Sequence, residues 1–369
     1  MRRMHLAFVA VVVTAALGLL RAQGQSPAPT ALPQPSFHHI HLNSVDPEKS
    51  IAWYGQYWPK GKKTTFAGFP AFTDNEGFYL LYTKAEKRAP GSFSRSGERS
   101  VPQSAFWTFG STFQGPNLDP VLDRLKKSNA KAFELVTLYG GAEGKLTATH
   151  SLALPSGGQL LRDSALRQRQ AEPGQPPPAA SGGGLDFAYV VDPDGMLVEV
   201  TSGNREGFRE HTHFWSERPL CAANWHVEHL GATFPPNANP FDEGLSFKNG
   251  KWDPCDVPVG EVTFPTYMKR GQLRIPAGNA RVANANWLWY PRQCRSGRCG
   301  AGNDQPLSRS RGQVVDHIGL TYPDLDKVIA HLRATNVPIS QGPYKFGDTR
   351  ALLIEDPDGL AFELIEAKP

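Results

Sequence analysis

The chain has 369 residues, of which 40% are hydrophobic, and a formal net charge of +4. This length allows two or three globular domains, and the apolar content is ample for their cores. The small net charge argues against the clustered basic surface that nucleic-acid binding needs, so we expect no nucleic-acid partner.

Residues 1–24 are predicted to be a secretory signal peptide. They combine Arg2 and Arg3 with an apolar run and with small residues near Ala22, which is the pattern of such peptides. The run is short for a transmembrane helix, so we expect an exported protein with no membrane anchor after cleavage. Residues 25–35 are rich in proline and are expected to form a flexible lead-in.

Export makes disulfide bonds the favoured state of the cysteines, because secreted chains fold in an oxidising compartment. Four cysteines can pair in three ways, and the sequence does not choose between them. A local bridge in the Gly/Arg-rich loop near residue 297 fits the spacing of the last two. The cysteines are Cys221, Cys255, Cys294 and Cys299.

A strand–turn–helix pattern begins at three histidines. "HIHLNSVDPEKSIAWY" starts at His39 and "HTHFWSERPLCAANWH" at His211, and they share His-x-His, Ser, Pro and Trp at equal spacing. A third copy, "HIGLTYPDLDKVIAHL", starts at His317. The residues after each first histidine alternate, which predicts a strand with apolar side chains on one face and histidines on the other.

A fourth unit is more weakly marked. "LDPVLDRLKKSNA" from Leu118 matches the helical part of the third copy, "LDKVIAHLRATNV" from Leu325. The strand expected before it, near Phe106–Thr108, carries no histidine where the third copy has one.

Two "D-P-D-G" stretches predict hairpins at the ends of units. They lie in "VDPDGMLVEV" (191–200) and "EDPDGLAFEL" (355–364), each between two apolar runs. Glu199 and Glu363 follow at the same distance from the turn glycine. A carboxylate buried there needs a charge partner or a metal; an edge strand with the glutamate in water is the alternative.

The units are expected to group in two consecutive pairs. The first pair spans 36–205 and carries a Pro/Gly-rich insertion at 168–184. The second spans 206–369 and carries a loop insertion at 235–286. Both insertions are expected to be loops, because their composition lacks a helical or strand period.

Tandem units that open with a histidine strand and close with D-P-D-G-x-x-x-E resemble the vicinal oxygen chelate superfamily. This superfamily includes glyoxalase I, bleomycin-resistance proteins and extradiol dioxygenases. The resemblance covers nearly all of the mature chain outside the two insertions. It implies an α+β fold in which four βαβββ units form two half-barrel domains.

The resemblance also implies a metal site in the second pair of units. Carried over residue by residue, it makes His211, His317 and Glu363 the ligands of one divalent metal. Two imidazoles and a carboxylate suit Fe²⁺, with Mn²⁺, Zn²⁺ or Ni²⁺ as alternatives. The first pair supplies only His39 and Glu199 and is expected to be a structural or substrate-shaping half, although a second site there stays open.

Further site candidates follow from position. His213 shares a strand face with a predicted ligand, so proton transfer is proposed for it, with a rim position as the alternative. Tyr344 and Arg350 precede the last hairpin and are candidates for substrate contact, although solvation explains them equally. His226 and His229 are expected on the solvent-exposed face of a helix.

The resemblance implies a metal-dependent enzyme acting on a small substrate that chelates the metal through vicinal oxygens. Extradiol-dioxygenase-like ring cleavage and a glyoxalase-like lyase or isomerase reaction are both compatible with it. The alternative is a non-catalytic protein that sequesters a small molecule, as bleomycin-resistance proteins do. Some members complete the metal site with a partner chain, so a homodimer stays open.

Overall fold

The computed structural model describes residues 32–58, 60–74, 76–93, 99–114, 135–137, 149–151, 187–203, 207–234, 247–256, 278–282, 285–291 and 306–367. Several predicted features lie outside these residues. They are the signal peptide at 1–24, most of the lead-in at 25–35, the insertion at 168–184, most of the loop at 235–286, the helix from residue 118, and Cys294 and Cys299. No helix among the described residues is both long and apolar enough to cross a membrane.

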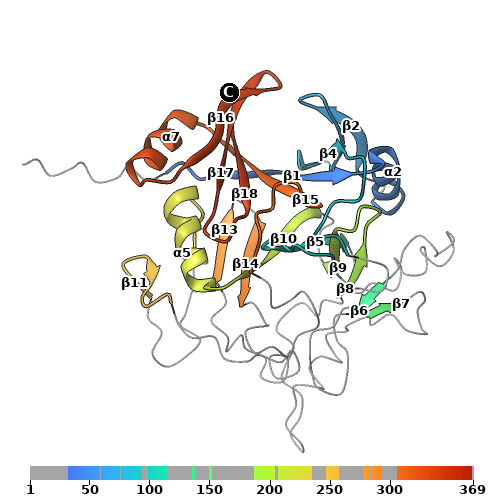
Figure 1. Cartoon of the computed structure of the whole chain (residues 1–369), viewed down its shortest axis with the longest axis horizontal. Helices are drawn as coiled ribbons and strands as arrows, with labels where there is room; N and C mark the ends of the chain where they lie inside the picture. The colour runs from blue at the N-terminus through green and yellow to red at the C-terminus, as the bar shows by residue number, and fades with distance from the viewer. Residues whose placement is uncertain are drawn as a thin grey trace, which may run out of the picture. The chain divides into compact units, whose positions relative to one another are not determined.

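Two eight-stranded sheets contain nearly all the described strands (Figure 1). The first has the order β16-β17-β18-β15-β1-β4-β3-β2. Its strands are β1 (Ser36–Ser44), β2 (Lys62–Phe66), β3 (Phe69–Thr73), β4 (Tyr79–Lys84), β15 (Val315–Tyr322), β16 (Ile339–Phe346), β17 (Thr349–Glu355) and β18 (Ala361–Glu366).

The second sheet has the order β13-β14-β10-β5-β9-β8-β6-β7. Its strands are β5 (Phe106–Gln114), β6 (Leu135–Thr137), β7 (Thr149–Ser151), β8 (Phe187–Val191), β9 (Leu197–Gly203), β10 (Gly207–Ser216), β13 (Gly278–Val282) and β14 (Ala285–Pro291). A separate hairpin joins β11 (Phe247–Lys248) to β12 (Lys251–Trp252). Mixed parallel and antiparallel pairing with few helices confirms the α+β class.

The sheets join the units differently from the sequence expectation. Strand β1 of the unit that begins at His39 pairs with β15 of the unit that begins at His317. Strand β5 of the weakly marked unit near Phe106 pairs with β10 of the unit that begins at His211. The expected grouping into 36–205 and 206–369 is therefore wrong as a division of the sheets. All the opening strands have one apolar face, and this alternation fixes which side chains share a face but not which strand lies alongside.

Three described helices accompany these strands: α2 (Pro47–Tyr57), α5 (Pro219–Leu230) and α7 (Leu325–Ala334). The side chain of Asp46 accepts a hydrogen bond from the Lys49 amide, and Asp324 caps α7 in the same way. Proline, which fits the first helical turn, begins α2 and α5. A left-handed Gly231 ends α5, as glycine commonly does.

The strands predicted to begin at His39, His211 and His317 are confirmed as parts of β1, β10 and β15. Ile40, Leu42, Phe214, Ile318 and Leu320 are all fully buried on the face away from the histidines. The two D-P-D-G hairpins are also confirmed, because β8 pairs antiparallel with β9 and β17 with β18.

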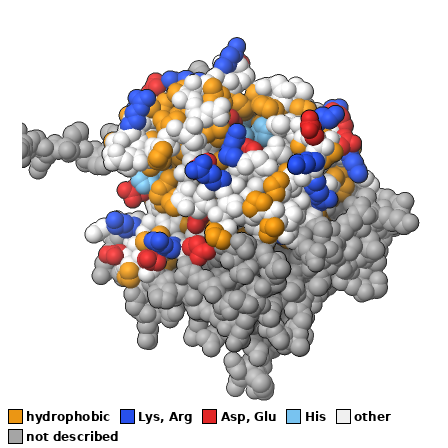
Figure 2. All heavy atoms as spheres, viewed as in Figure 1, with side chains coloured by type: hydrophobic (Ala, Val, Ile, Leu, Met, Phe, Trp, Pro, Cys, Tyr) orange, Lys and Arg blue, Asp and Glu red, His pale blue; other side chains and the backbone are white. Residues whose placement is uncertain are grey.

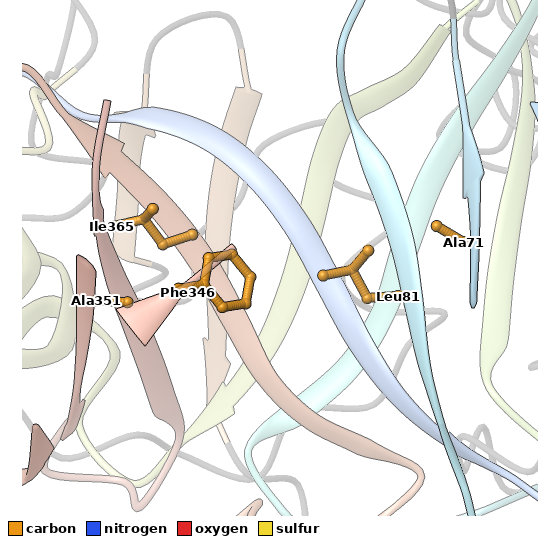
Figure 3. Packing of buried hydrophobic residues seen from close by; sticks show 5 residues of the cluster. All are labelled: Ala71, Leu81, Phe346, Ala351 and Ile365. Atoms are coloured by element: carbon orange, nitrogen blue, oxygen red, sulfur yellow. The ribbon is translucent and has the colours of Figure 1, made fainter. Parts of the chain in front are cut away.

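The first sheet curls so that side chains at the ends of its two edge strands, β2 and β16, come into contact. The ring of Phe66 at the end of β2 lies 5.7 Å from the ring of Phe346 at the end of β16. Next to this contact, buried residues from the units that begin at His39 and His317 pack together (Figure 3). They are Ala71, Leu81, Phe346, Ala351 and Ile365. The result is a half-barrel whose inner face carries the histidines of β1 and β15.

Each D-P-D-G turn contacts a helix that packs on the other sheet. The Tyr54 hydroxyl in α2 donates to Asp192 Oδ2 at 3.0 Å. His226 Nε2 in α5 lies 3.4 Å from Asp356 Oδ2. The prediction that His226 and His229 face water is wrong, since they are only 0% and 9% exposed. The two sheets are thus linked twice, each time by a contact between a turn of one sheet and a helix that packs on the other.

Cys221 in α5 and Cys255 form a disulfide bond with an S–S distance of 2.06 Å. This is one of the pairings that the sequence left open. On the face shown in Figure 2, basic and acidic side chains are interspersed rather than gathered by sign.

Candidate metal centre

Four side chains from three neighbouring strands meet on the inner face of the first sheet. We call this group the first cluster: His39 and His41 from β1, His317 from β15 and Glu363 from β18. All four are buried. One ring nitrogen from each histidine lies within 4.8 Å of the others.

The strand register explains how a histidine and a glutamate two strands apart can meet. His39 pairs with Gly319 on β15, and Gly319 pairs with Glu363 on β18. A β-carbon at Gly319 would overlap the His39 ring. The glycine of this His–Gly–Glu row therefore leaves the space through which His39 reaches Glu363, as glycine does where groups approach a strand closely.

Three atoms of the first cluster converge without forming hydrogen bonds. Glu363 Oε2 lies 3.5 Å from His39 Nε2 and 3.9 Å from His317 Nε2. None of these three buried atoms has a hydrogen-bond partner among the described residues. Ligand atoms about 2.0–2.2 Å from a zinc-sized ion lie about 3.0–3.5 Å apart, so the two distances from Glu363 Oε2 to the histidine nitrogens are close to those of ligands that share one divalent metal.

Hydrogen bonds to the remaining polar atoms orient two of these ligands. His317 Nδ1 donates to Asp316 Oδ1 at 2.7 Å, which leaves a lone pair on Nε2. Asp316 is held in turn by the Gly312 amide at 2.7 Å and by Arg311 at 2.6 Å. Such carboxylate–histidine pairs commonly support metal ligands.

The glutamate is oriented by Tyr344. The Tyr344 hydroxyl donates a hydrogen bond to Glu363 Oε1, so the other oxygen, Oε2, faces the histidines. Burial, the negative charge of Glu363 and this bond all raise the pKa of Tyr344, so its hydroxyl stays protonated. Burial also raises the pKa of Glu363, while His317 and Tyr344 oppose that shift.

Burial keeps the histidines of β1 neutral, as metal binding requires. Burial, with smaller contributions from neighbouring histidines, lowers the pKa of His39 well below its usual range. Burial likewise lowers the pKa of His41 to about 3. His38 Nδ1 and His39 Nδ1 lie 2.9 Å apart, so a His39 that binds a metal through Nε2 can donate its Nδ1 proton to His38.

A second cluster lies on the other sheet. Glu199 on β9 meets His211 and His213 on β10, and one ligand atom from each lies within 4.8 Å of the others. Glu199 Oε1 is 3.3 Å from His211 Nε2, and Glu199 Oε2 is 3.7 Å from His213 Nδ1. The pKa of His213 is lowered to about 3 by burial, although Glu199 opposes this shift.

The structure thus divides the predicted metal triad between two places. His317 and Glu363 lie together, but their third partner is His39 and not His211. The triad of His211, His317 and Glu363 is wrong because β10 pairs with β5 and not with β15. His213 belongs with His211 in the second cluster. His39 and Glu199 do not share a site, since they lie in different clusters.

The other two candidates have different outcomes. Tyr344 contacts the first cluster through Glu363. Arg350 does not belong to it, because its guanidinium binds Glu366 at 2.8 and 2.9 Å and Asp326 at 2.8 Å. Successive side chains of a strand alternate between faces, and Glu366 points away from the face that carries Glu363.

Sequence reasoning missed His41 and Asp316. His41 Nε2 is hydrogen-bonded to Thr83 Oγ1 at 2.8 Å, and its Nδ1 has no such bond within the described ranges. The signal was present, because "HIH" at His39 repeats the His-x-His pattern that drew attention to His213.

The fold resembles solved structures of low sequence identity. A point mutant of glyoxalase I from Zea mays matches with a TM-score of 0.50 and 13% identity, over 90% of this chain and 92% of that chain. Unmutated Zea mays glyoxalase I gives 0.48 and 14%, with coverage of 90% and 92%. A halotolerant catechol dioxygenase gives 0.25 and 11%, with coverage of 92% and 88%.

No protein-family model and no curated protein matches the sequence. The structural match to the Zea mays mutant therefore shows the fold alone. The chain has the fold of glyoxalase I, as its resemblance to the vicinal oxygen chelate superfamily implied.

Proposed function

We propose that the chain is a metal-dependent enzyme whose reaction centre is the first cluster. The observation that carries this proposal is the convergence of His39 Nε2, His317 Nε2 and Glu363 Oε2 in a buried place, without hydrogen bonds from the described residues. Leaving a buried polar atom without a partner costs about 1–3 kcal/mol. A cation bound by all three atoms would offset that cost.

The donor set defines the metals that fit. Two imidazoles and one carboxylate suit Fe²⁺, Mn²⁺, Zn²⁺ or Ni²⁺ and leave coordination positions open. A metal held there would act as a Lewis acid and as a template for a substrate with two vicinal oxygens. The proposed substrates are therefore small molecules such as catechols or hemithioacetals.

The protein's own side chains would orient the ligands and handle protons. Tyr344 directs Glu363 Oε2 toward the histidines, and Asp316 fixes the proton of His317 on Nδ1. His41 is the proposed proton acceptor, the role first given to His213. A hydrogen bond of 2.8 Å with Thr83 Oγ1 holds its Nε2. Nδ1 is then the nitrogen that can take up a proton.

The first test is metal content. Protein purified without added chelator is expected to contain a divalent metal, and His317→Ala should lower the amount by one ion per chain. His331→Ala, which removes a histidine of α7 outside both clusters, is the matched control. Metal at trace level that His317→Ala leaves unchanged would contradict the proposal.

The second test separates the reaction classes. Metal-loaded protein is assayed for oxygen uptake with catechols and for isomerisation of a hemithioacetal. Activity in one assay that is lost in His317→Ala supports an enzyme and assigns its class. Tight binding of these compounds without turnover would instead favour the sequestering protein.

We also propose that the protein works outside the cytoplasm. The predicted signal peptide at 1–24 is the basis of this proposal. The Cys221–Cys255 disulfide supports it, because such bonds are rare in reducing compartments.

A further inference from the structure

The second cluster is built on the same strand register as the first. His211 pairs with Gly110 on β5, and Gly110 pairs with Glu199 on β9. A β-carbon at Gly110 would overlap the His211 ring, so this glycine also leaves space for a histidine to reach a glutamate. The row His211–Gly110–Glu199 thus repeats the row that forms the first cluster.

The two clusters differ at one position. His317 pairs with His41 in the first sheet, and Thr108 pairs with His213 in the second. Thr108 is fully buried and its hydroxyl donates to the Leu197 carbonyl at 2.9 Å. That hydroxyl is engaged with the backbone, so a third ligand of the second cluster must come from elsewhere.

His213 is placed to be that third ligand. It lies two residues from His211, so both side chains extend from the same face of β10. The two rings are 4.7 Å apart and nearly parallel, at 29°. Trp107 packs at 5.2 Å from the His213 ring and at 4.4 Å from Trp215, which restricts the ring to this position.

The second cluster is nearly buried and has the donors of a transition-metal site. The side chains of Glu199, His211 and His213 are 9%, 12% and 10% exposed. Two imidazole nitrogens and a carboxylate favour ions such as Zn²⁺ or Ni²⁺ over Ca²⁺ and Mg²⁺, which prefer oxygen ligands.

We propose that Glu199, His211 and His213 form a second divalent transition-metal site, occupied independently of the first cluster. It differs from the first because both nitrogen ligands come from one strand. Glu199 directs a separate oxygen to each histidine, whereas Glu363 directs one oxygen to both. We expect it to bind more weakly, because it lacks a counterpart of His317 with its supporting Asp316.

The test is a calorimetric titration of the metal-free full-length mature protein with ZnCl₂. Wild-type protein should bind two ions per chain in distinguishable steps. His317→Ala should weaken the tighter step and His213→Ala the weaker step, each by at least about 100-fold, beyond the 10–100-fold typical of losing a supporting residue. The double variant should bind neither ion, and His331→Ala should behave as wild type.

Co²⁺ provides a readout that does not depend on enzyme activity. Its visible absorption spectrum should show two sets of bands in the wild type and one set in each single variant.

Unfolding curves in EDTA should show that the variants are folded; if His213→Ala is not, His213→Gln replaces it. A second ion that persists unchanged in both His213→Ala and Glu199→Gln would overturn the proposal. So would a wild-type stoichiometry of one that only His317→Ala abolishes. An ion bound at the second cluster while the first cluster stays empty would contradict the proposed function but would support this site.

Discussion

His39 occupies the space above Gly319, the residue directly opposite it across the antiparallel pair β1–β15. Gly319→Ala would place a methyl group in that space and push the ring away from Glu363. We expect the metal affinity of the first cluster to fall by at least about 100-fold, the upper end of the 10–100-fold typical of losing a supporting residue. Overpacking should also cost about 1–3 kcal/mol of stability. Titration and urea unfolding measure the two effects.

Gly110→Ala is the matched control for this experiment. It makes the same change opposite His211 in the second sheet. It should leave the first cluster's metal in place and impair only the second cluster. If both variants bound both ions like the wild type, the role given to these glycines would be wrong.

Two supporting hydrogen bonds should set the metal affinity of the first cluster. Tyr344→Phe removes the donor to Glu363 Oε1, and Asp316→Asn weakens the acceptor for His317 Nδ1. Losses of about 10–100-fold in affinity are expected for each, because such partners fix ligand orientation. Competition with a chromophoric chelator measures the change. Arg350→Gln should bind metal normally, since Arg350 contacts Glu366 and Asp326 instead; equal losses in all three variants would indicate a general structural effect.

Much of the local structure could be predicted from the sequence. The period-two alternation after His39, His211 and His317 placed three strands correctly and separated their histidines from their apolar side chains. The D-P-D-G turns placed two hairpins, each with a glutamate on the final strand. These features depend on residues close together in the chain, where side-chain period and turn chemistry act directly.

The partner of each strand could not be predicted in the same way. Alternation fixes the face of a strand, while any opening strand could lie beside any other. The metal triad failed for this reason, since it joined His211 to the strands of His317 and Glu363. A signal did exist in Gly110 and Gly319, each an isolated glycine inside an apolar strand. Such a glycine marks close approach, and here it stands opposite a histidine.

The hydrogen bond between Tyr54 and Asp192 should stabilise the contact of α2 with the second sheet. Tyr54→Phe keeps the ring and removes only the hydroxyl, which leaves a buried carboxyl with one partner fewer. Burial raises the pKa of Asp192 to about 7, so at pH 8 the carboxylate is largely charged and the loss should be about 1–3 kcal/mol. Urea unfolding at pH 8 measures it. Tyr79→Phe, at a partly exposed tyrosine of β4, should change stability much less; an equal effect would argue against the bond.

His226 should make the protein sensitive to acid. Burial lowers its pKa from 6.5 to about 3, and its bond with the Ala222 carbonyl only partly opposes this. Below pH 6.5 the His226 side chain is protonated in the unfolded chain but stays neutral in the folded chain. The free energy of unfolding therefore falls as the pH is lowered from about 6.5 toward 3. Asp356 acts in the opposite direction: burial raises its pKa, so its contribution is present at low pH and is lost as the pH rises.

His226→Gln removes the first effect and keeps Asp356 in place. Between pH 7 and pH 5 the wild type should lose about 2 kcal/mol more stability than this variant. Each pH unit below 6.5 costs about 1.4 kcal/mol, and pH 5 lies about 1.5 units below that value. Urea unfolding at both pH values in EDTA measures the difference free of metal effects. His331→Gln on α7 serves as the control and should follow the wild type. Parallel pH profiles for wild type and His226→Gln would show that His226 is not the group responsible.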